Sequence, residues 1–232
     1  MKKLIAVFLL LTTYSCAELQ QVVNQLPGTG LSNDQIALGL KEALNQGIDR
    51  QVSRLTEKDG FFKNELVKIV LPDELQKVDN TLRKIGLSGL ADEGLKVLNR
   101  AAENAVKEAT PIFVDAVKEM TFNDAKNILL GADNAATLYL ENKTSSELYG
   151  KFNPVIKSSL DNVGATQIWS KIIDKYNSLP LTTPVNPDLP DYVTNEAMDG
   201  VFTMIAFEEN KIRKNVSSRS TAVLQQVFAL QD

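Results

Sequence analysis

The segment that offers the most chemistry is a charged run near the carboxyl end, Glu208-Glu209-Asn210-Lys211-Ile212-Arg213. On a helix, Glu209 and Arg213 lie one turn apart, with the acid in the favourable N-terminal position of the pair. Arg219 follows a few residues later. A carboxylate pair here could serve a ligand site as acid and base. The same spacing fits a surface ion pair, or a partly buried network that holds the last helix in place.

A second polar group, Asn99, Arg100 and Glu103, lies within a stretch of small apolar residues. Arg100 and Glu103 are spaced to interact on one helical face. Polar side chains beside a core stripe are usually solvated or paired, so a structural role is the simpler interpretation. Together the two groups define a candidate polar cluster, structural or ligand-binding, of Asn99, Arg100, Glu103, Glu208, Glu209, Arg213 and Arg219.

Composition excludes many metal and cofactor sites. The chain has no histidine, and Cys16 is its single cysteine. Histidine-based triads, histidine-ligated zinc, disulfides within the chain and cysteine clusters are therefore ruled out. Asp115, Glu119 and Asp124 form an acidic patch in sequence, but calcium needs six or more oxygens in a constrained geometry and no EF-hand loop is present. We expect no metal and no cofactor.

Other catalytic motifs are incomplete. Lys157-Ser158-Ser159 lacks a partner that would orient a nucleophile, and Gly28-Thr29-Gly30 lacks the lysine and the strand-loop-helix context of a phosphate loop. We therefore expect that the protein is not an enzyme. The weakest alternative is a hydrolase that uses the carboxylate of Glu103, Glu208 or Glu209.

Residues 1–16 predict a lipoprotein-type signal peptide. Lys2-Lys3 forms a positive region, Leu4–Leu11 a short apolar run, and Ser15 a small residue before Cys16. The apolar run is too short to span a membrane as a helix. We expect lipidation of Cys16, because the only cysteine of the chain lies at the end of the apolar run. Three acyl chains on this cysteine would anchor the protein firmly.

The residue after the cysteine is Ala17 rather than aspartate. By resemblance to bacterial lipoproteins, this favours the periplasm and anchoring to the outer membrane. The alternative is ordinary signal cleavage after Ala17. We expect residues 17–32 to form a tether, which precedes a single all-helical domain at 33–232.

The charge balance excludes nucleic acid as a partner. The full chain has a formal charge of −4, and loss of Lys2 and Lys3 leaves 23 basic against 29 acidic residues, a charge of −6. Neutralisation of phosphates supplies most nucleic-acid affinity, and this chain has no long basic run. The partners we expect are the membrane, through the N-terminal lipid, and a protein of the cell envelope.

The element that must position the polar residues is the stretch 87–120. Apolar or small residues recur there at steps of three and four, which predicts a helix with one continuous buried stripe. Much of the stripe is alanine or glycine, so neighbouring backbones can approach closely. Pro111 predicts either a kink or two abutting helices, with Thr110 as a cap. The fold class we predict is all-α, an irregular multi-helix bundle around this long central helix.

Other helices are expected on both sides of this stretch. Ser32 or Asn33 caps a helix over 33–58, and Pro72 opens the next one. Capping patterns then start helices at Thr121, Asp133 and Thr144, and Gly164 ends the third. The stretch 69–71 is expected to be a buried extended or helical turn, because no partner strand is evident. The proline-rich connector 177–190 precedes helices over 191–232.

Several stretches together resemble a bacterial family catalogued as a domain of unknown function (number four-one-nine-seven). They include LSNDQIALGLKEAL, DGFF, IVLP, LNRAAENA, PIFVDAVKEMTFNDAKNILLG, AATLYL, FNPVI and EENKIR with a following arginine, and they cover roughly residues 31–230. The resemblance implies an exported helical protein, often a lipoprotein, and it brings no activity. It also implies that the family's shared polar and glycine positions are Asp59, Gly60, Asn99, Arg100, Glu103, Asp124, Gly131, Glu208, Glu209, Arg213 and Arg219.

The function we predict is that of an exported, lipid-anchored cell-envelope protein that acts as a non-enzymatic structural or interaction component. The export signal and the missing catalytic residue types favour it. The alternative is a carrier of a small apolar ligand or lipid in an interhelical cavity, which the small-residue stripe beside aromatic residues would suit.

Overall fold

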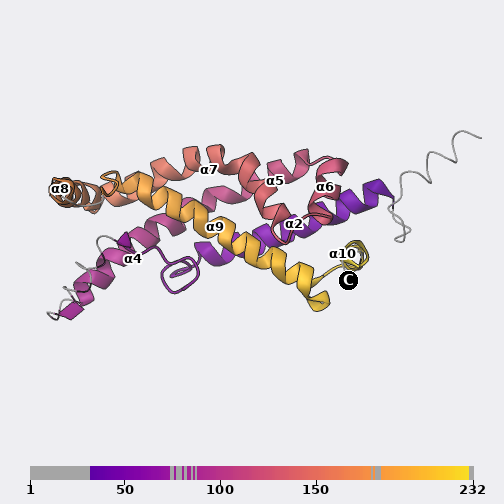
Figure 1. The fold of residues 1–232 in the computed structure, drawn as a ribbon, viewed down its shortest axis with the longest axis horizontal. Helices are drawn as coiled ribbons and strands as arrows, with labels where there is room; N and C mark the ends of the chain where they lie inside the picture. The colour runs from indigo at the N-terminus through magenta and orange to yellow at the C-terminus, as the bar shows by residue number, and fades with distance from the viewer. Residues whose placement is uncertain are drawn as a thin grey trace, which may run out of the picture.

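The computed structural model describes residues 32–229, except 74–75, 77–79, 81–82, 85, 87, 179 and 181–183. Within these residues the protein is built of α-helices and short 3₁₀ helices, and it contains no β-strand (Figure 1). The predicted all-α, multi-helix fold class is confirmed. The elements are α2 (Asn33–Thr56), α4 (Ser88–Ala105), η2 (Val106–Glu108), α5 (Ala109–Glu119), α6 (Phe122–Leu129), α7 (Ala135–Asp161), α8 (Ala165–Asn177), α9 (Leu189–Lys214), η3 (Val216–Ser218) and α10 (Ala222–Phe228).

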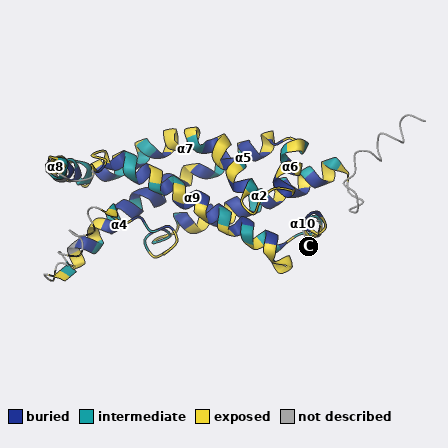
Figure 2. Cartoon of the chain, viewed as in Figure 1, coloured by how far each residue is buried: buried dark blue, intermediate teal, exposed yellow. Residues whose placement is uncertain are grey.

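The bundle is elongated, and the long helices α2, α7 and α9 run along it (Figure 1). Helix α9 packs against both α7 and α2, while α4 and α5 pack against α7. Helix α8 lies at one end, and the start of α2 lies at the other, near α6 and α10. Buried residues line the inward faces of the long helices (Figure 2). None of the described helices has the length and apolarity needed to cross a membrane.

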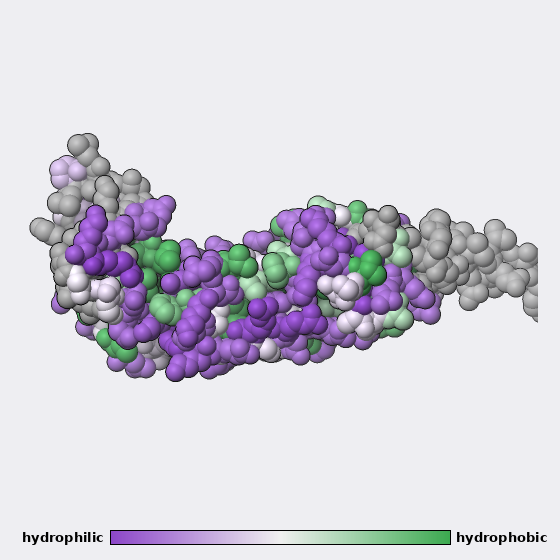
Figure 3. All heavy atoms as spheres, turned by 90° about the horizontal axis from the view of Figure 1, so that it is seen from below, coloured by the Kyte–Doolittle hydropathy of each residue, from purple (hydrophilic) through white to green (hydrophobic). Residues whose placement is uncertain are grey.

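The core forms two clusters that follow from the predicted stripes. The larger cluster contains Phe61, Phe113, Phe152 and most of the central segment's alanines. The smaller cluster joins Ile36 and its neighbours on α2 to α6 and α10. The outer face seen in Figure 3 is mainly hydrophilic, with small separate apolar spots. This is the pattern expected of amphipathic helices that bury one side.

The central segment is divided. Helix α4 ends at Ala105, and a 3₁₀ turn over Val106–Glu108 leads into α5 at Ala109. The break precedes Pro111 because proline has no N–H for the carbonyl four residues earlier and its ring crowds that turn. The predicted interruption is therefore present, but the cap is not Thr110: Glu108 occupies the cap position and makes no side-chain hydrogen bond there.

Two predicted helix starts are confirmed in detail. Ser32 caps α2 and forms a reciprocal capping box with Gln35. Thr121 and Asp124 form the same box at the start of α6. The hydrogen bonds from the Thr121 hydroxyl and its backbone N–H lower the pKa of Asp124. Gly164 also acts as predicted, since its φ of 70° separates α7 from α8.

Two other predicted starts are wrong. Helix α7 is continuous from Ala135 to Asp161, so Thr144 does not open a new helix. Its side chain is buried, and its hydroxyl donates to the Leu140 carbonyl one turn earlier. A buried threonine in this position satisfies its own hydroxyl within the helix. Asp133 does not cap α7 either, because Asn134 occupies the cap position, and the Asp133 carboxylate instead forms an exposed ion pair with Lys214.

The segment from Lys68 to Pro72 is irregular, as expected for the stretch 69–71. Most of the helix expected after Pro72 falls among the undescribed positions. Residues 1–31, with the predicted leader and all but the last residue of the predicted tether, lie outside the described residues.

Candidate functional site

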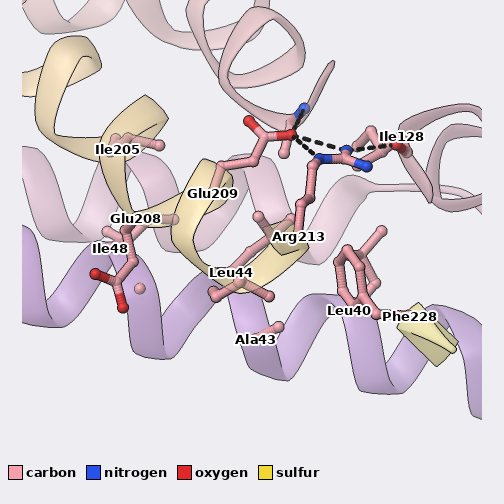
Figure 4. Close-up of a pocket in the computed structure, with 13 residues that line it drawn as sticks. Leu40, Ala43, Leu44, Ile48, Ile128, Ile205, Glu208, Glu209, Arg213 and Phe228 are labelled. Atoms are coloured by element: carbon pink, nitrogen blue, oxygen red, sulfur yellow. Dashed lines mark hydrogen bonds and ion pairs between the residues drawn. The ribbon is translucent and has the colours of Figure 1, made fainter. Parts of the chain in front are cut away.

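The seven residues of the candidate polar cluster do not converge on one cleft. Asn99, Arg100 and Glu103 lie on α4, beside the loop that follows α2. Glu208 and Glu209, although adjacent in sequence, point to different neighbours of α9 (Figure 4). The cluster is therefore a set of separate contacts, and each is built from its own residues.

Glu209 and Arg213 form a buried ion pair with Arg213 Nη2 2.8 Å from Glu209 Oε1. Both Glu209 oxygens also accept backbone N–H groups at the start of α7, from Ala136 and Thr137, each at 2.9 Å. Arg213 Nη2 donates to the Ile128 carbonyl at the end of α6, at 2.7 Å. The Glu209 carboxylate thus lies at the positive N-terminal end of α7, and the Arg213 guanidinium lies at the negative C-terminal end of α6.

This pair explains why α7 needs no cap from its own sequence. Its cap residue, Asn134, makes no side-chain capping hydrogen bond. The first N–H groups of a helix lack partners within that helix, and here Glu209 supplies them from 72 residues away. Of the alternatives from the sequence, the surface ion pair is wrong, because side-chain exposure is only 3% for Arg213 and 6% for Glu209.

Arg219 binds backbone carbonyl groups in the last turn of α9. Its Nη2 donates to the Arg213 carbonyl at 3.0 Å, and its Nε donates to the Ile212 carbonyl at 3.2 Å. The guanidinium groups of Arg213 and Arg219 each lie 5.7 Å from the ring centre of Phe228 on α10. Helix α10 is therefore held to α9 through cation–π contacts of these arginines as well as through its apolar face.

Glu208 faces α2. Its Oε2 accepts a hydrogen bond from Gln51 Nε2 at 2.9 Å, and its Oε1 pairs with Arg50. The side chain of Glu208 is 3% exposed, whereas that of Arg50 is 46% exposed. A buried carboxylate here is balanced by one cation from the surface and one amide from the interior.

Asn99 binds the irregular segment after α2 as a strand would. It accepts from the Ile69 N–H at 2.9 Å and donates to the Ile69 carbonyl at 2.8 Å. A second donation reaches the Leu95 carbonyl. The side-chain amide thus replaces the missing partner strand, which is how a buried extended turn is tolerated.

Arg100 lies between two carboxylates. It contacts Asp59 and Glu103, each at 2.5 Å, and Glu103 also accepts the Phe61 N–H at 3.3 Å. Asp59 has a φ of 70°, a left-handed conformation that non-glycine residues seldom adopt. A hydrogen bond from Lys63 and the charge of Arg100 lower the pKa of Asp59. The group fixes the turn between α2 and the loop.

These contacts account for the buried charges of the candidate cluster. Glu103, Glu208, Glu209, Arg213 and Arg219 each bind a backbone group, an amide or an opposite charge. Among the described residues, no group of three metal-binding side chains is brought together.

An apolar space lies between α2 and α9, lined by Leu40, Leu44, Ile205, Ile212 and Phe228 among others (Figure 4). Its volume is about 30 Å³. That is room for one or two waters and far less than an acyl chain requires. This space is therefore too small to support the alternative that the protein carries a lipid between its helices.

Sequence reasoning missed Arg50, Gln51 and Thr137, which complete the contacts of Glu208 and Glu209. Gln51 carried one signal: it lies one turn before the apolar Leu55 in the helix expected over 33–58. Thr137 carried none, because its contact depends on how α7 and α9 cross.

The model of the family described as "Protein of unknown function (DUF4197)" matches residues 30–229. The resemblance stated from the sequence is thereby confirmed. Searches of the curated proteins and of the solved structures gave no match.

Proposed function

The chain belongs to the family of proteins of unknown function DUF4197, and from that premise we propose that it is a non-enzymatic component of the bacterial cell envelope. In this proposal a lipid on Cys16 holds it to the periplasmic side of the outer membrane, and its helical body contacts a protein partner.

The observation that supports a non-enzymatic role is the use made of the buried charges. Glu209 and Arg213 bind the ends of α7 and α6, Arg219 binds the end of α9, and Glu103 binds the loop after α2. A catalytic acid or base must reach a substrate, whereas these groups are occupied by the fold itself.

The leader supports the location. Its positive start, short apolar run and single cysteine are the pattern of a lipoprotein signal. Helix α2, which Ser32 caps, begins at the end of the bundle near α6 and α10 (Figure 1). Residues 17–31, even fully extended, would reach roughly 50 Å. The body would therefore stay close to the membrane surface.

The anchor can be tested in the full chain, expressed in a bacterium that is fed an alkyne-tagged fatty acid. We expect the wild-type protein to take up the tag and to fractionate with the outer membrane. Cys16→Ser should lose the tag, and Ser15→Ala, which keeps a small residue before the cysteine, should retain it. An untagged wild-type protein whose N-terminus is Glu18 would instead establish ordinary cleavage after Ala17 and overturn the anchor.

The partner requires a separate experiment. Envelopes from cells that express the tagged chain are crosslinked, and the captured proteins are compared with those captured by an unrelated outer-membrane lipoprotein. We expect the same partner in repeated captures by this chain alone. Repeated captures without a reproducible specific partner would contradict an interaction role.

A further inference from the structure

A hollow lies on the surface where the end of α2, the loop after it and α9 meet, and its volume is about 510 Å³. The loop, residues 57–72, protrudes from one long side of the bundle (Figure 1). The apolar part of the lining is Leu66 from the loop with Met204 and Phe207 from α9. The hollow therefore opens on the side of the molecule, where a second protein can lie against it.

The apolar part of the lining is open to solvent. Leu66 is 59% exposed and Phe207 is 48% exposed, and they come from distant parts of the chain. Met204 is buried, and its sulfur contacts Asn64 Nδ2 at 3.6 Å. Single exposed apolar residues are ordinary, but two that the fold brings to one hollow mark a surface for contact with another molecule.

Two other exposed apolar residues have a local explanation. Val163 and Ile168 occupy the positions just before the cap and four residues after it at the start of α8. Those are the positions of a hydrophobic staple, which fixes how the chain enters a helix. Leu66 and Phe207 lie on different elements and have no such role.

The charged rim of the hollow is balanced, with three cations and three acids. Lys63 and Asp59 pair within the chain, with Lys63 Nζ 2.9 Å from Asp59 Oδ2. The other four, two of each sign, are exposed and form no ion pair with any described residue: Arg54, Lys58, Glu57 and Glu65. A partner of one sign, such as a nucleic acid or an anionic membrane, is attracted by half of these charges and repelled by the other half.

A second copy of the chain matches this rim. A two-fold dimer uses the same surface on both subunits, so a residue that contacts another across the interface is contacted by it in turn. The two free cations of each copy can therefore lie beside the two free acids of the other. The apolar residues match in the same way, because Phe207 of each copy can fill the hollow beside Leu66 of the other.

We propose that this side of the bundle is the interface of a two-fold symmetric homodimer, with Phe207 at its centre. The dimer is weak, because the hollow is lined by 11 residues, whereas a standard interface uses roughly 20–30 on each side. We expect a dissociation constant on the order of 100 μM. The proposal rests on the described residues and does not depend on lipidation of Cys16 or on another envelope protein.

The first test is sedimentation equilibrium of the chain from Ala17 onward, because the buried residues of both described core clusters lie between Ile36 and Phe228. We expect a monomer–dimer equilibrium for the wild type. Phe207→Ser should weaken the dimer roughly tenfold or more, as for loss of a central aromatic anchor. The matched control is Ile168→Ser, which removes an apolar residue 60% exposed on α8 and should leave association unchanged.

Two charge-reversed chains test whether the partner is a second copy. One carries Arg54→Glu with Lys58→Glu, so that its free rim charges are all acidic. The other carries Glu57→Lys with Glu65→Lys, so that they are all basic. Each chain alone should stay monomeric, because like charges then face each other across the two-fold axis. An equal mixture of the two should form a heterodimer, and Phe207→Ser in both chains should abolish it.

A wild-type chain that stays monomeric at several times the expected dissociation constant would overturn the proposal. So would equal losses of association in the Phe207→Ser and Ile168→Ser variants, or charge-reversed chains that each associate with themselves as the wild type does. A monomeric wild type that binds the apolar probe phenylnaphthylamine, with binding lost in Phe207→Ser, would instead make the hollow a small-molecule site. Circular dichroism of each variant checks that the fold is retained.

Discussion

Glu209 and Arg213 join two helices to which neither belongs. The carboxylate binds the first N–H groups of α7, and the guanidinium binds the last carbonyls of α6, while the two side chains pair at 2.8 Å. The connection between α6 and α7 is thereby held by the interior face of α9. One ion pair on α9 satisfies backbone groups on two other helices, so its loss affects more than a single contact.

Replacing Glu209 with glutamine should destabilise the fold strongly. The guanidinium of Arg213 would stay buried without a negative partner, which typically costs about 3–5 kcal/mol. The measurement is the free energy of unfolding in urea. Asp115→Asn is the control, because Asp115 and Lys118 form a pair about 70% exposed and should contribute less than about 1 kcal/mol. Similar losses in the two variants would show that the buried pair has no special role.

Removing the side-chain amide of Asn99 should release the loop after α2. Asn99→Ala leaves the N–H and the carbonyl of Ile69 without their partner in a buried environment, at a cost of roughly 2–4 kcal/mol. Hydrogen exchange at the Ile69 amide should become much faster. Asn104→Ala serves as a control, since Asn104 is exposed and bonds Lys107. Unchanged exchange at Ile69 in Asn99→Ala would contradict the bridging role.

Two glycines should respond to alanine with opposite signs. A Cβ on Gly60 would lie 2.4 Å from the Arg54 carbonyl oxygen, so Gly60→Ala must displace backbone and should cost about 1–3 kcal/mol. Gly94 lies exposed within α4, where an added Cβ meets nothing within 4 Å. Gly94→Ala should therefore stabilise the protein by about 0.5–1 kcal/mol. Thermal unfolding of both variants gives the signs directly, and a stable Gly60→Ala would show that the turn can relax.

Glu196 should contribute more to stability at low pH than at neutral pH, the opposite of a carboxylate in an ion pair. Burial and the nearby Asp199 raise the pKa of Glu196 above its ordinary value of 4.5. As pH rises past about 4.5, the unfolded chain ionises first, so this group's contribution to stability is present at low pH and lost as pH passes the folded pKa.

Glu196→Gln should therefore stabilise the protein at pH 7 and have little effect at pH 4. The measurement is the urea midpoint at both values. Glu147→Gln, an exposed position on α7, is the comparison. A Glu196 variant that loses stability at pH 7 would mean that the carboxylate has a favourable partner.

The parts of the fold that depend on residues close together in the sequence could be predicted. Apolar residues at steps of three and four predicted the helices. Two helix starts could also be predicted, because the partners of each capping box lie within one turn: Ser32 with Gln35, and Thr121 with Asp124. The misplaced start at Thr144 shows the limit of such patterns. The same threonine can cap a helix or bond the preceding turn within one, and burial decides between them.

The composition and local spacing also determined much about the candidate site. The absence of histidine removed whole classes of metal and catalytic chemistry, and the predicted leader is the basis of the proposed envelope location, which stays a prediction. The i,i+4 spacing indicated that Glu209 and Arg213 would pair. These conclusions need only residue identities and distances along one chain.

Tertiary structure alone decided what the polar residues do. Glu208 and Glu209 are adjacent in sequence yet serve α2 and α7, because consecutive side chains on a helix point about 100° apart. Asn99 binds the backbone of Ile69, and Leu66 borders the same hollow as Phe207, only because the bundle brings those segments together. Contacts over tens of residues are fixed by how helices cross and pack, and no local pattern in the sequence records that geometry.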